Sequence, residues 1–424
     1  MAAAYYPRAR VLLEVLLEDF GDGSSSDLHS LDIVPLSAEV DRNDHREADS
    51  ARIELAYRDL PLDPRAARAM TAYVFMGDVG APDLDVPMDD ANYRVFVGQV
   101  DLPETTLEDG GETVSLECRD FTSLFLDHKW RGSIDIDRDL VSIIEDIVAS
   151  VPGASGLQRQ YEYHSWATTP SAVLGRTLWV PGKGEDAWTV LTSLLGALGM
   201  LPVVELDVLR ITTLENLGQR RAALLYGDNI SRLVFRRNFQ ETSTSRVVAT
   251  TWDEQAREAR TASYPSDPAI RKRLGLDGIA TVSEPQVLLQ LMGSYTETQL
   301  EDIARETWLE MARGQVEGEL ETKELRDGDD QVDLWQLAAG DTLLVTLGKG
   351  DPSFFASMSE SEAVAWLTAG SRGLDQGAAQ ALVASWRQAE ELGSLFYVVR
   401  ASHRWRLEEG YSLTVEFATL IGGE

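Results

Sequence analysis

The first third of the chain alternates between apolar and polar residues in the manner of half-buried strands. In "ARIELAYRD" the residues Ile53, Leu55 and Tyr57 fall on one face, and arginine and glutamate fall on the other. Such alternation is typical of an antiparallel strand with one buried face. Two further strand-like segments, "YRVFVGQVDL" and "ETVSLECRDF", are joined by a connection that ends in an Asp-Gly-Gly turn signal at 109–111. The pattern predicts antiparallel strands over residues 1–128.

The spacing of apolar residues becomes helical in the middle of the chain. Apolar side chains recur three and four positions apart in 140–148 and again in 187–198, where Gly199 is suited to cap the helix C-terminus. The segment 200–213 then has the pattern of a short hairpin. Residues 129–225 are therefore predicted to form a small mixed α/β unit.

Strand patterns return in the last part of the chain, with two interruptions. Residues 266–313 are predicted to be an irregular, proline-containing excursion followed by an amphipathic helix. Residues 354–392 have the spacing of two helices and predict a helical hairpin inserted among strands. We expect 226–265 and 314–424 to form a second β-domain around these interruptions.

Two hairpin segments of this pattern share one layout. "FVGQVDLPETTLEDGGETVSLECRDF" and "FYVVRASHRWRLEEGYSLTVEFATL" each contain an apolar strand, a polar stretch up to a leucine (Leu107 or Leu407), an acidic glycine turn and an alternating strand. The shared layout indicates two β-domains of related design, one at each end of the chain. Any two hairpins can look alike, and chance similarity is the alternative explanation.

The charge balance narrows the possible partners. The 70 acidic residues outnumber the 38 lysines and arginines, which gives a formal net charge of −32 and a pI near 4.5. The electrostatic field of so negative a protein repels nucleic acid and anionic membranes. A DNA-binding role would need a separate basic patch, and the longest basic cluster, 271–273, is short. Only 5 of the basic residues are lysines, which fits either genome composition or adaptation to high salt. The sequence has neither a signal-peptide pattern nor an apolar run long enough to span a membrane.

The residues that could carry chemistry have simpler structural explanations. A single cysteine, Cys118, excludes an internal disulfide and a cysteine-based zinc site, and its place in an alternating segment predicts a buried strand residue. The histidines and the Gly-Lys-Gly at 182–184 match no catalytic or phosphate-binding motif. The acidic loop 83–90 could bind calcium but lacks the spacing of an EF-hand, so a solvated loop is expected. Aspartates at 135, 137 and 139 are expected to supply charge at a helix N-terminus. We predict no catalytic, cofactor-binding or metal-binding residues and no cofactor.

The order of elements resembles the baseplate hub family of phage tails, of the late control protein D type and the hub half of VgrG-like spike proteins. The first barrel of that family resembles "LSAEVDRNDHREADSARIELAYRDLPLDP" together with "YRVFVGQVDL" and "VSLECRDFTSLFLD". The family's middle unit resembles "VPGKGEDAWTVLTSLLGALGMLPVVELDVLRIT". The second barrel resembles "ETQLEDIARETWLEMARG", "VEGELETKEL", "LAAGDTLLVT" and "LFYVVRASHRWRLEEGYSLTVEF". The predicted helical hairpin departs from the family pattern.

The resemblance implies a β-rich α+β fold with two tube-type antiparallel β-barrel domains that flank a small α/β unit and carry helical insertions. The implied domains are a first barrel (1–128), a middle unit (129–225), a second barrel (226–265 and 314–424, with the insertion 354–392), and an excursion with a helix (266–313). No fused spike or lysozyme module is expected after the second barrel.

The implied function is mechanical. Three copies with two barrels each would form a homotrimeric ring that adapts a six-fold tail tube to a three-fold spike, with an acidic channel that repels DNA phosphates. The implied partners are further copies of the chain, a tail tube or distal tail protein, a central spike, and baseplate wedge and tape-measure proteins. Neither sequence-specific nucleic-acid binding nor stable membrane insertion is expected. The implied location is the virion tail or baseplate, assembled in the host cytoplasm.

Two alternatives stay open from the sequence. One is a tail-associated or carbohydrate-active lytic enzyme on a β-rich scaffold, which a cleft with two convergent acids and a raised pKa would favour. The other is the hub of a tail-like injection particle without a genome. Unpaired edge strands of the barrels are the expected contacts with neighbouring copies.

Overall fold

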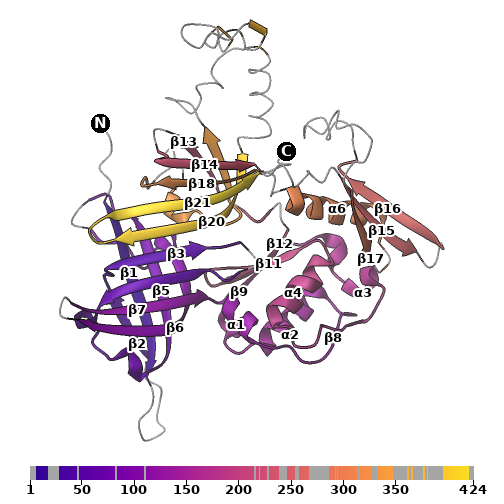
Figure 1. Ribbon diagram of the computed structural model, residues 1–424. Helices are drawn as coiled ribbons and strands as arrows, with labels where there is room; N and C mark the ends of the chain where they lie inside the picture. The colour runs from indigo at the N-terminus through magenta and orange to yellow at the C-terminus, as the bar shows by residue number, and fades with distance from the viewer. Residues whose placement is uncertain are drawn as a thin grey trace, which may run out of the picture.

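The computed structural model has a β-rich α+β fold, as the sequence predicts, with a large and mostly antiparallel sheet beside a helical part (Figure 1). The structure describes residues 6–17, 28–44, 47–81, 84–108, 111–213, 216–218, 220–226, 229–237, 246–253, 257–266, 286–291, 293, 295–312, 316–325, 332–346, 395–419 and a few isolated positions between 361 and 380.

The main sheet contains 13 strands drawn from both ends of the chain. The N-terminal strands are β1 (Pro7–Leu17), β2 (Leu28–Ile33), β3 (Ser37–Arg42), β4 (Ser50–Ala56), β5 (Ala67–Asp78), β6 (Arg94–Glu108) and β7 (Gly111–Asp120). The later strands are β13 (Arg221–Leu225), β14 (Arg232–Arg237), β18 (Val316–Thr322), β19 (Thr342–Thr346), β20 (Leu395–Arg406) and β21 (Gly410–Thr419). Short 3-10 turns η1 (Tyr57–Asp59), η2 (Pro64–Ala66), η3 (Ala91–Tyr93) and η8 (Leu334–Gln336) lie between them.

The strand order joins the two halves into one sheet. Along the hydrogen-bonded path the order is β14-β18-β21-β20-β3-β4-β7-β6-β5-β1-β2, with β19 attached to β20 and β13 attached to β19. The N-terminal strands thus meet the C-terminal strands at β3 and β20, which pair antiparallel over six residues, from Ser37 opposite Arg406 to Arg42 opposite Ala401. The two β-rich halves also share one apolar core, which contains Ile53 and Leu116 from one half and Leu320 and Val415 from the other.

The two hairpins that share a sequence layout also share a strand register. The hairpin β6–β7 has three paired residues, a one-residue bulge at Asp101 and seven further pairs before its turn. The hairpin β20–β21 has three pairs, a one-residue bulge at Val399 and seven further pairs. Because a bulge shifts the register at one fixed place, its recurrence at the same position supports two units of related design.

The strands beside each hairpin correspond as well. On the outer side of β7 lies β4, with Ile53 opposite Leu116, and on the outer side of β21 lies β18, with Leu320 opposite Val415. The next strands are β3 and β14, and the strands paired with the start of each hairpin are β5 and β19. Five strands of each half therefore match, in the orders β3-β4-β7-β6-β5 and β14-β18-β21-β20-β19.

One detail of the predicted repeat is wrong. The sequence layout equates Leu107 with Leu407, whereas the register equates Leu107 with Trp405, since Leu107 lies opposite Glu112 and Trp405 lies opposite Tyr411. The turn of β20–β21 is one residue longer than that of β6–β7, which accounts for one of the two residues by which the sequence layout is out of register. Cys118 is a buried strand residue, as predicted.

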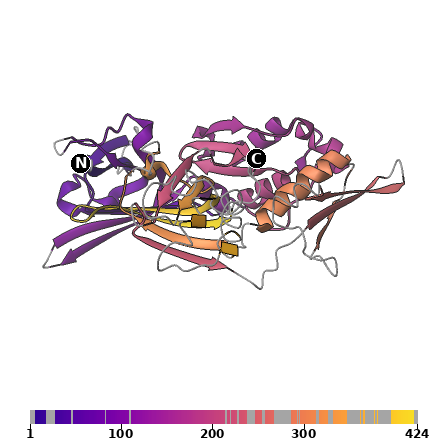
Figure 2. The same cartoon turned by 90° about the horizontal axis from the view of Figure 1, so that it is seen from above.

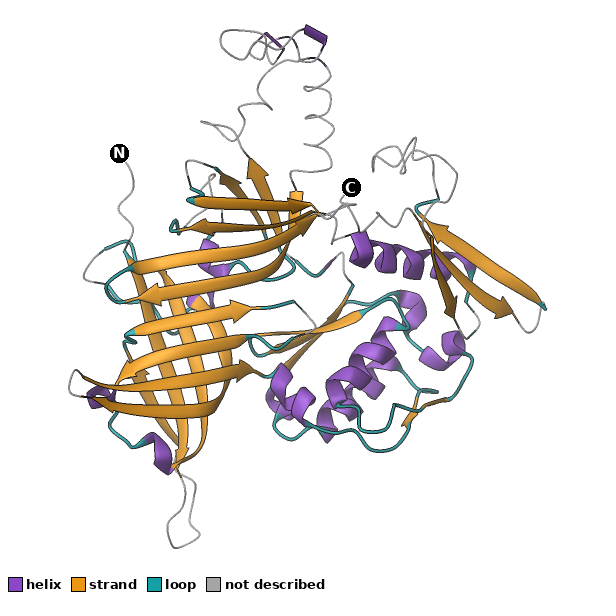
Figure 3. Ribbon diagram, in the orientation of Figure 1, coloured by secondary structure: helices purple, strands orange, loops and turns teal. Residues whose placement is uncertain are grey.

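The middle of the chain forms the helical part (Figure 3). Its elements are α1 (Thr122–Asp127), β8 (Ile134–Asp135), α2 (Leu140–Ser150), η4 (Ala154–Gly156), β9 (Gln158–Tyr161), η5 (Ser165–Ala167), α3 (Pro170–Leu174), β10 (Leu178–Trp179), α4 (Ala187–Gly196), β11 (Leu201–Glu205) and β12 (Val208–Thr212). The side chain of Asp139 caps α2 by accepting the N–H of Ser142, as the predicted role of an aspartate at this position requires. Gly199 has a positive φ of 69°, and the N–H of Met200 reaches back to the carbonyl of Leu195, which closes α4 as expected.

The strands β15 (Arg246–Asp253), β16 (Glu258–Tyr264) and β17 (Gln286–Leu291) form a separate sheet beside α6 (Glu297–Ala312). Figure 2 shows this sheet beyond α6, away from the main sheet. This differs from the sequence prediction, which assigns 226–265 to the second barrel and treats the start of 266–313 as irregular. Alternation identifies a half-buried strand but not its partner strand. Val247 and Ala249 on the buried face of β15 pack into the core of the helical part, which also contains Trp308 of α6.

The predicted helical hairpin at 354–392 lies outside the described residues, apart from a few isolated positions. The remaining domain boundaries stay predictions. Among the described helices, none is both long and apolar enough to cross a membrane.

Candidate functional site

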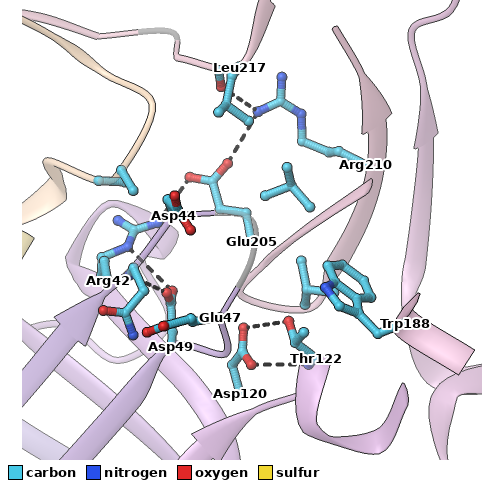
Figure 4. Close-up of a pocket in the computed structure, with 15 residues that line it drawn as sticks. Arg42, Asp44, Glu47, Asp49, Asp120, Thr122, Trp188, Glu205, Arg210 and Leu217 are labelled. Atoms are coloured by element: carbon cyan, nitrogen blue, oxygen red, sulfur yellow. Dashed lines mark hydrogen bonds and ion pairs between the residues drawn. The ribbon is translucent and has the colours of Figure 1, made fainter. Parts of the chain in front are cut away.

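A cluster of buried charges lies where the two β-rich halves meet the helical part (Figure 4). It surrounds a cavity of about 30 Å³ that is lined by residues from the β3–β4 loop, the end of β7, α4, β11, β12 and the loop before β19. The lining residues are Arg42, Asn43, Asp44, Glu47, Asp49, Asp120, Thr122, Trp188, Val203, Val204, Glu205, Arg210, Leu217, Ala338 and Ala339.

Arg42 contacts all three parts of the chain. It is the last residue of β3 and is only 4% exposed. Its Nη1 donates to the carbonyl of Gln336 at 3.1 Å, its Nη2 donates to Oε1 of Glu205 at 3.1 Å, and its Nε lies 4.0 Å from Oδ2 of Asp49. One guanidinium thereby ties the N-terminal strands to the helical part and to the C-terminal half.

Three arginines form ion pairs with Glu205 at the end of β11. Besides Arg42, Nη1 of Arg210 lies 3.4 Å from its Oε2, and Nη1 of Arg220 lies 3.7 Å from its Oε1. Burial raises the pKa of Glu205, but the three guanidinium charges outweigh burial and leave the pKa below its ordinary value. Glu205 is therefore an anion that holds the cationic side of the cluster together.

Arg210 extends the cluster into the helical part. It is 4% exposed on β12, and its guanidinium donates to the carbonyls of Leu217 at 3.3 Å and Asn216 at 3.1 Å. Its Nη2 also lies 3.6 Å from Oε2 of Glu162. These contacts fasten the chain that leaves the helical part to the hairpin of β11 and β12.

Two aspartates on the other side of the cavity have raised pKa values. Burial raises the pKa of Asp49 to about 7, although the charge of Arg42 lowers it in part. Burial, followed by the nearby charge of Asp49, raises the pKa of Asp120 well above its ordinary value. Both oxygens of Asp120 accept hydrogen bonds from Thr122, one from the backbone N–H and one from the hydroxyl, each at 3.0 Å.

A buried aspartate and a buried histidine secure the C-terminal side. Asp341 accepts the N–H groups of Ala338 at 2.9 Å and Arg220 at 3.0 Å. His403 of β20 is fully buried, with Nε2 2.8 Å from the carbonyl of Leu337 and Nδ1 2.8 Å from the hydroxyl of Tyr411. Since a carbonyl can only accept, Nε2 carries the proton and Tyr411 donates to Nδ1. Burial lowers the pKa of His403 to about 3, so this histidine is neutral.

The geometry of the cluster suits a structural lock, meaning a set of contacts that hold the two β-rich halves and the helical part in one arrangement. It does not suit a substrate site. A cavity of about 30 Å³ holds roughly one water molecule, whereas small-molecule pockets have volumes on the order of several hundred Å³. The two aspartates with raised pKa values are the feature that would favour a lytic enzyme, but this cavity has no room for a sugar ring. A larger groove of about 400 Å³ is lined by Glu297 and Glu301, which project from one helix and do not face each other across it.

The outer face of the long strands is the second candidate surface. Residues directly opposite one another in a sheet point to the same side, so the pairing from β14 to β6 assigns ten carboxylates and seven arginines to the face opposite the core. They are Glu39, Asp41, Glu54, Glu104, Glu108, Glu117, Glu317, Glu319, Glu321, Glu416, Arg52, Arg119, Arg232, Arg236, Arg400, Arg404 and Arg406. Ten acids less seven arginines leave −3, so this face is weakly acidic.

Comparison with solved structures identifies the fold. No protein-family model matches the sequence, and no curated protein matches it. A tail protein from Neisseria meningitidis MC58 superposes with a TM-score of 0.57 at 14% identity, covering 97% of this chain and 96% of that one. The 43 kDa tail protein of prophage MuSo2 from Shewanella oneidensis superposes with a TM-score of 0.55 at 12% identity, covering 96% and 98%. The chain has the fold of phage tail proteins.

The residues singled out in the sequence have mostly local roles in this tail-protein fold. Asp85 pairs with Arg10 at 2.8 Å, and Asp90 caps a 3-10 turn by accepting the N–H of Asn92. Asp135 accepts the N–H of Asp137, and position 83 lies outside the described residues. In the described part of the chain, no group of three or more histidine, cysteine or acidic side chains could hold a metal ion.

The buried charges were missed by the sequence reasoning, although the sequence contains a signal for them. Arg42 follows Ala38 and Val40 on the apolar face of an alternating strand, and Arg210 interrupts the apolar run of β12. An arginine in line with core residues must find a buried anion, because an unpaired buried charge is costly. The partners come from distant segments, and local patterns do not identify them.

Arg42→Met tests the lock. Methionine keeps the apolar stem but removes the guanidinium, which leaves Glu205 with fewer partners and the carbonyl of Gln336 without its donor. We expect the free energy of unfolding to fall by about 3 kcal/mol, as measured by urea denaturation. The matched control is Arg58→Met, at a side chain that is 87% exposed, and it should change the stability by less than about 0.5 kcal/mol. Equal stabilities of the two variants would contradict the proposed role of Arg42.

Asp49→Asn tests the raised pKa of this aspartate. The native pKa of about 7 lies above the unfolded value, so the native state binds more protons between about pH 4 and 7. The contribution of Asp49 to stability therefore falls as the pH rises through this window, and asparagine removes that loss. The stability of Asp49→Asn relative to the parent should rise by about 2 kcal/mol from pH 5 to pH 8 in denaturation experiments. A difference that stays constant with pH would contradict the raised pKa.

Proposed function

We propose that the chain is a structural tail hub and not an enzyme: a protein that forms a homotrimeric ring between a tail tube and a central spike. The observation that carries this proposal is the internal repeat. Two β-rich units with the same five-strand order and the same bulged hairpin lie side by side in one sheet. Three copies of a chain with two such units present six, which is what an adaptor between six-fold and three-fold partners requires.

The buried charge cluster supports the proposal because an adaptor must hold its two units at a fixed angle. Arg42, Glu205 and Arg210 connect both units to the helical part through buried contacts. Buried ionic groups often contribute little net stability, and we infer that in this chain they specify one arrangement of the two units over others. The cluster would thus keep the two units from moving independently within the ring.

The proposed partners are further copies of the chain, a tail tube or distal tail protein, the spike, and baseplate wedge and tape-measure proteins. The fold shared with tail proteins of a prophage and of Neisseria meningitidis supports a location in a tail. A channel lined by the outer face of the long strands would carry a formal −3 per chain from the strand-paired residues, which is far below the −32 of the whole chain. Most of the negative charge would then face other surfaces.

The mass of the purified protein in solution tests the proposed trimer. Each chain has a mass of 46.8 kDa, and light scattering at moderate and high salt should give three times this mass in at least one condition. High salt screens the repulsion between acidic chains, so trimerisation that appears only there would also support the role of charge. A monomer or dimer at every salt concentration would contradict the trimer and favour the enzyme.

A further inference from the structure

Two of the strand edges that lack a partner strand in the described part of the chain belong to β14 and to the second half of β6. β14 is the last strand at one end of the sheet, and its outer edge has no partner strand there. In β6, residues 103–108 pair with β7 on one side only, because β5 covers β6 just over 94–99. Figure 1 shows β14 and β6 at opposite ends of the stack of long strands.

The internal repeat indicates what such edges pair with. By the matched registers, 103–108 of β6 corresponds to 401–406 of β20, and 232–237 of β14 corresponds to 37–42 of β3. Within the chain, 401–406 pairs antiparallel with 37–42 and joins the two units. The two free edges are thus the repeat equivalents of two strands that already pair with each other.

We propose that β14 of one copy pairs antiparallel with residues 103–108 of a second copy, in the register that places Arg232 opposite Glu108 and Arg236 opposite Glu104. The inference rests on the proposed trimer and specifies its contact. The occupant of each edge is a second copy of this chain, and each copy would donate one edge and receive the other.

The charges of the two edges are complementary. The sequence of 232–237 is "RLVFRR", with three arginines and no acid, and that of 103–108 is "PETTLE", with two glutamates and no base. In the proposed register both glutamates face arginines. The internal pairing has the same feature with the signs exchanged, because Arg404 of β20 lies opposite Glu39 of β3. Opposite charges across a strand pair stabilise it, and like charges destabilise it.

The same charges disfavour the alternative pairings. Two β14 edges would bring arginines together, and two copies of 103–108 would bring glutamates together. Residues 103–108 would also meet Glu39 and Asp41 if they paired with a foreign β3. Like charges therefore disfavour pairing of either edge with the same edge of another copy. Because a two-fold contact would pair identical edges, the charges favour a head-to-tail contact, which can close a ring.

Apolar exposure at the two edges supports the same pairing. Leu107 is 64% exposed and Phe235 is 42% exposed, both high for large apolar side chains. The register places Leu107 opposite Leu233 on the side of the sheet that faces the core. Pro103 has no N–H and sits at the end of the proposed pairing, where one hydrogen bond is lost and the others can form.

A disulfide between copies tests the register. Thr106 and Val234 lie opposite one another in the proposed pairing and correspond to Arg404 and Glu39 of the internal one. Thr106→Cys and Val234→Cys are purified separately, mixed and oxidised, with Cys118 buried in both. We expect a covalent dimer on a non-reducing gel from the mixture. The matched control, Thr106→Cys mixed with Arg236→Cys, is two residues out of register and should give at least ten-fold less.

Charge reversal provides the second test. Glu104→Arg would face Arg236, and Arg236→Glu would face Glu104, so each variant should weaken association at least ten-fold by light scattering. Combining both changes in one chain should restore association to within about three-fold of the parent. A double variant no better than the single ones would overturn the proposed register, and circular dichroism checks that each variant is folded.

The combined outcomes separate this inference from the trimer. A parent trimer without the cross-link and without sensitivity to charge reversal overturns the edge pairing and leaves the hub intact. The cross-link in a parent that never forms trimers supports the edge pairing and overturns the ring. Absence of both the trimer and the cross-link overturns both.

Discussion

The antiparallel pairing of β3 with β20 is the contact on which the arrangement of the chain depends. It joins strands that are more than 350 residues apart in sequence, and among the described strands it is the only strand pairing between the two β-rich halves. Such a distant pairing has a high loop-closure cost. The shared apolar core behind the pair offsets this cost, since His403 and Trp405 from β20 and Val40 from β3 are buried there or beside it.

The buried charges determine how this sheet is held against the helical part. Arg42 leaves the end of β3 and meets Glu205 at the end of β11, while Gln336 accepts from the same guanidinium. Hydrophobic contact alone would let the two parts slide, because apolar packing has little directionality. Charge-assisted hydrogen bonds have defined geometry, so they select one orientation.

The sequence predicts the local elements well and their long-range partners less well. Alternation at Ile53 and Leu55 and helical spacing behind Asp139 are local features, and the structure has a strand and a helix there. The hairpin likeness between the chain ends also holds. The pairing of β15 with β16 and β17 in a separate sheet was missed, because alternation does not specify the partner strand. The charge cluster was missed for a similar reason: Arg42, Glu205 and Asp341 come together only in three dimensions.

The central claim is that one chain supplies two equivalent units to a ring. End-on electron micrographs of the purified ring measure this directly through the rotational correlation of averaged images. Six similar units in a three-fold particle predict correlation peaks at about 60° intervals, with those at about 120° the strongest. Peaks at about 120° alone would mean that the two halves of the chain occupy unequal positions, and would contradict the account.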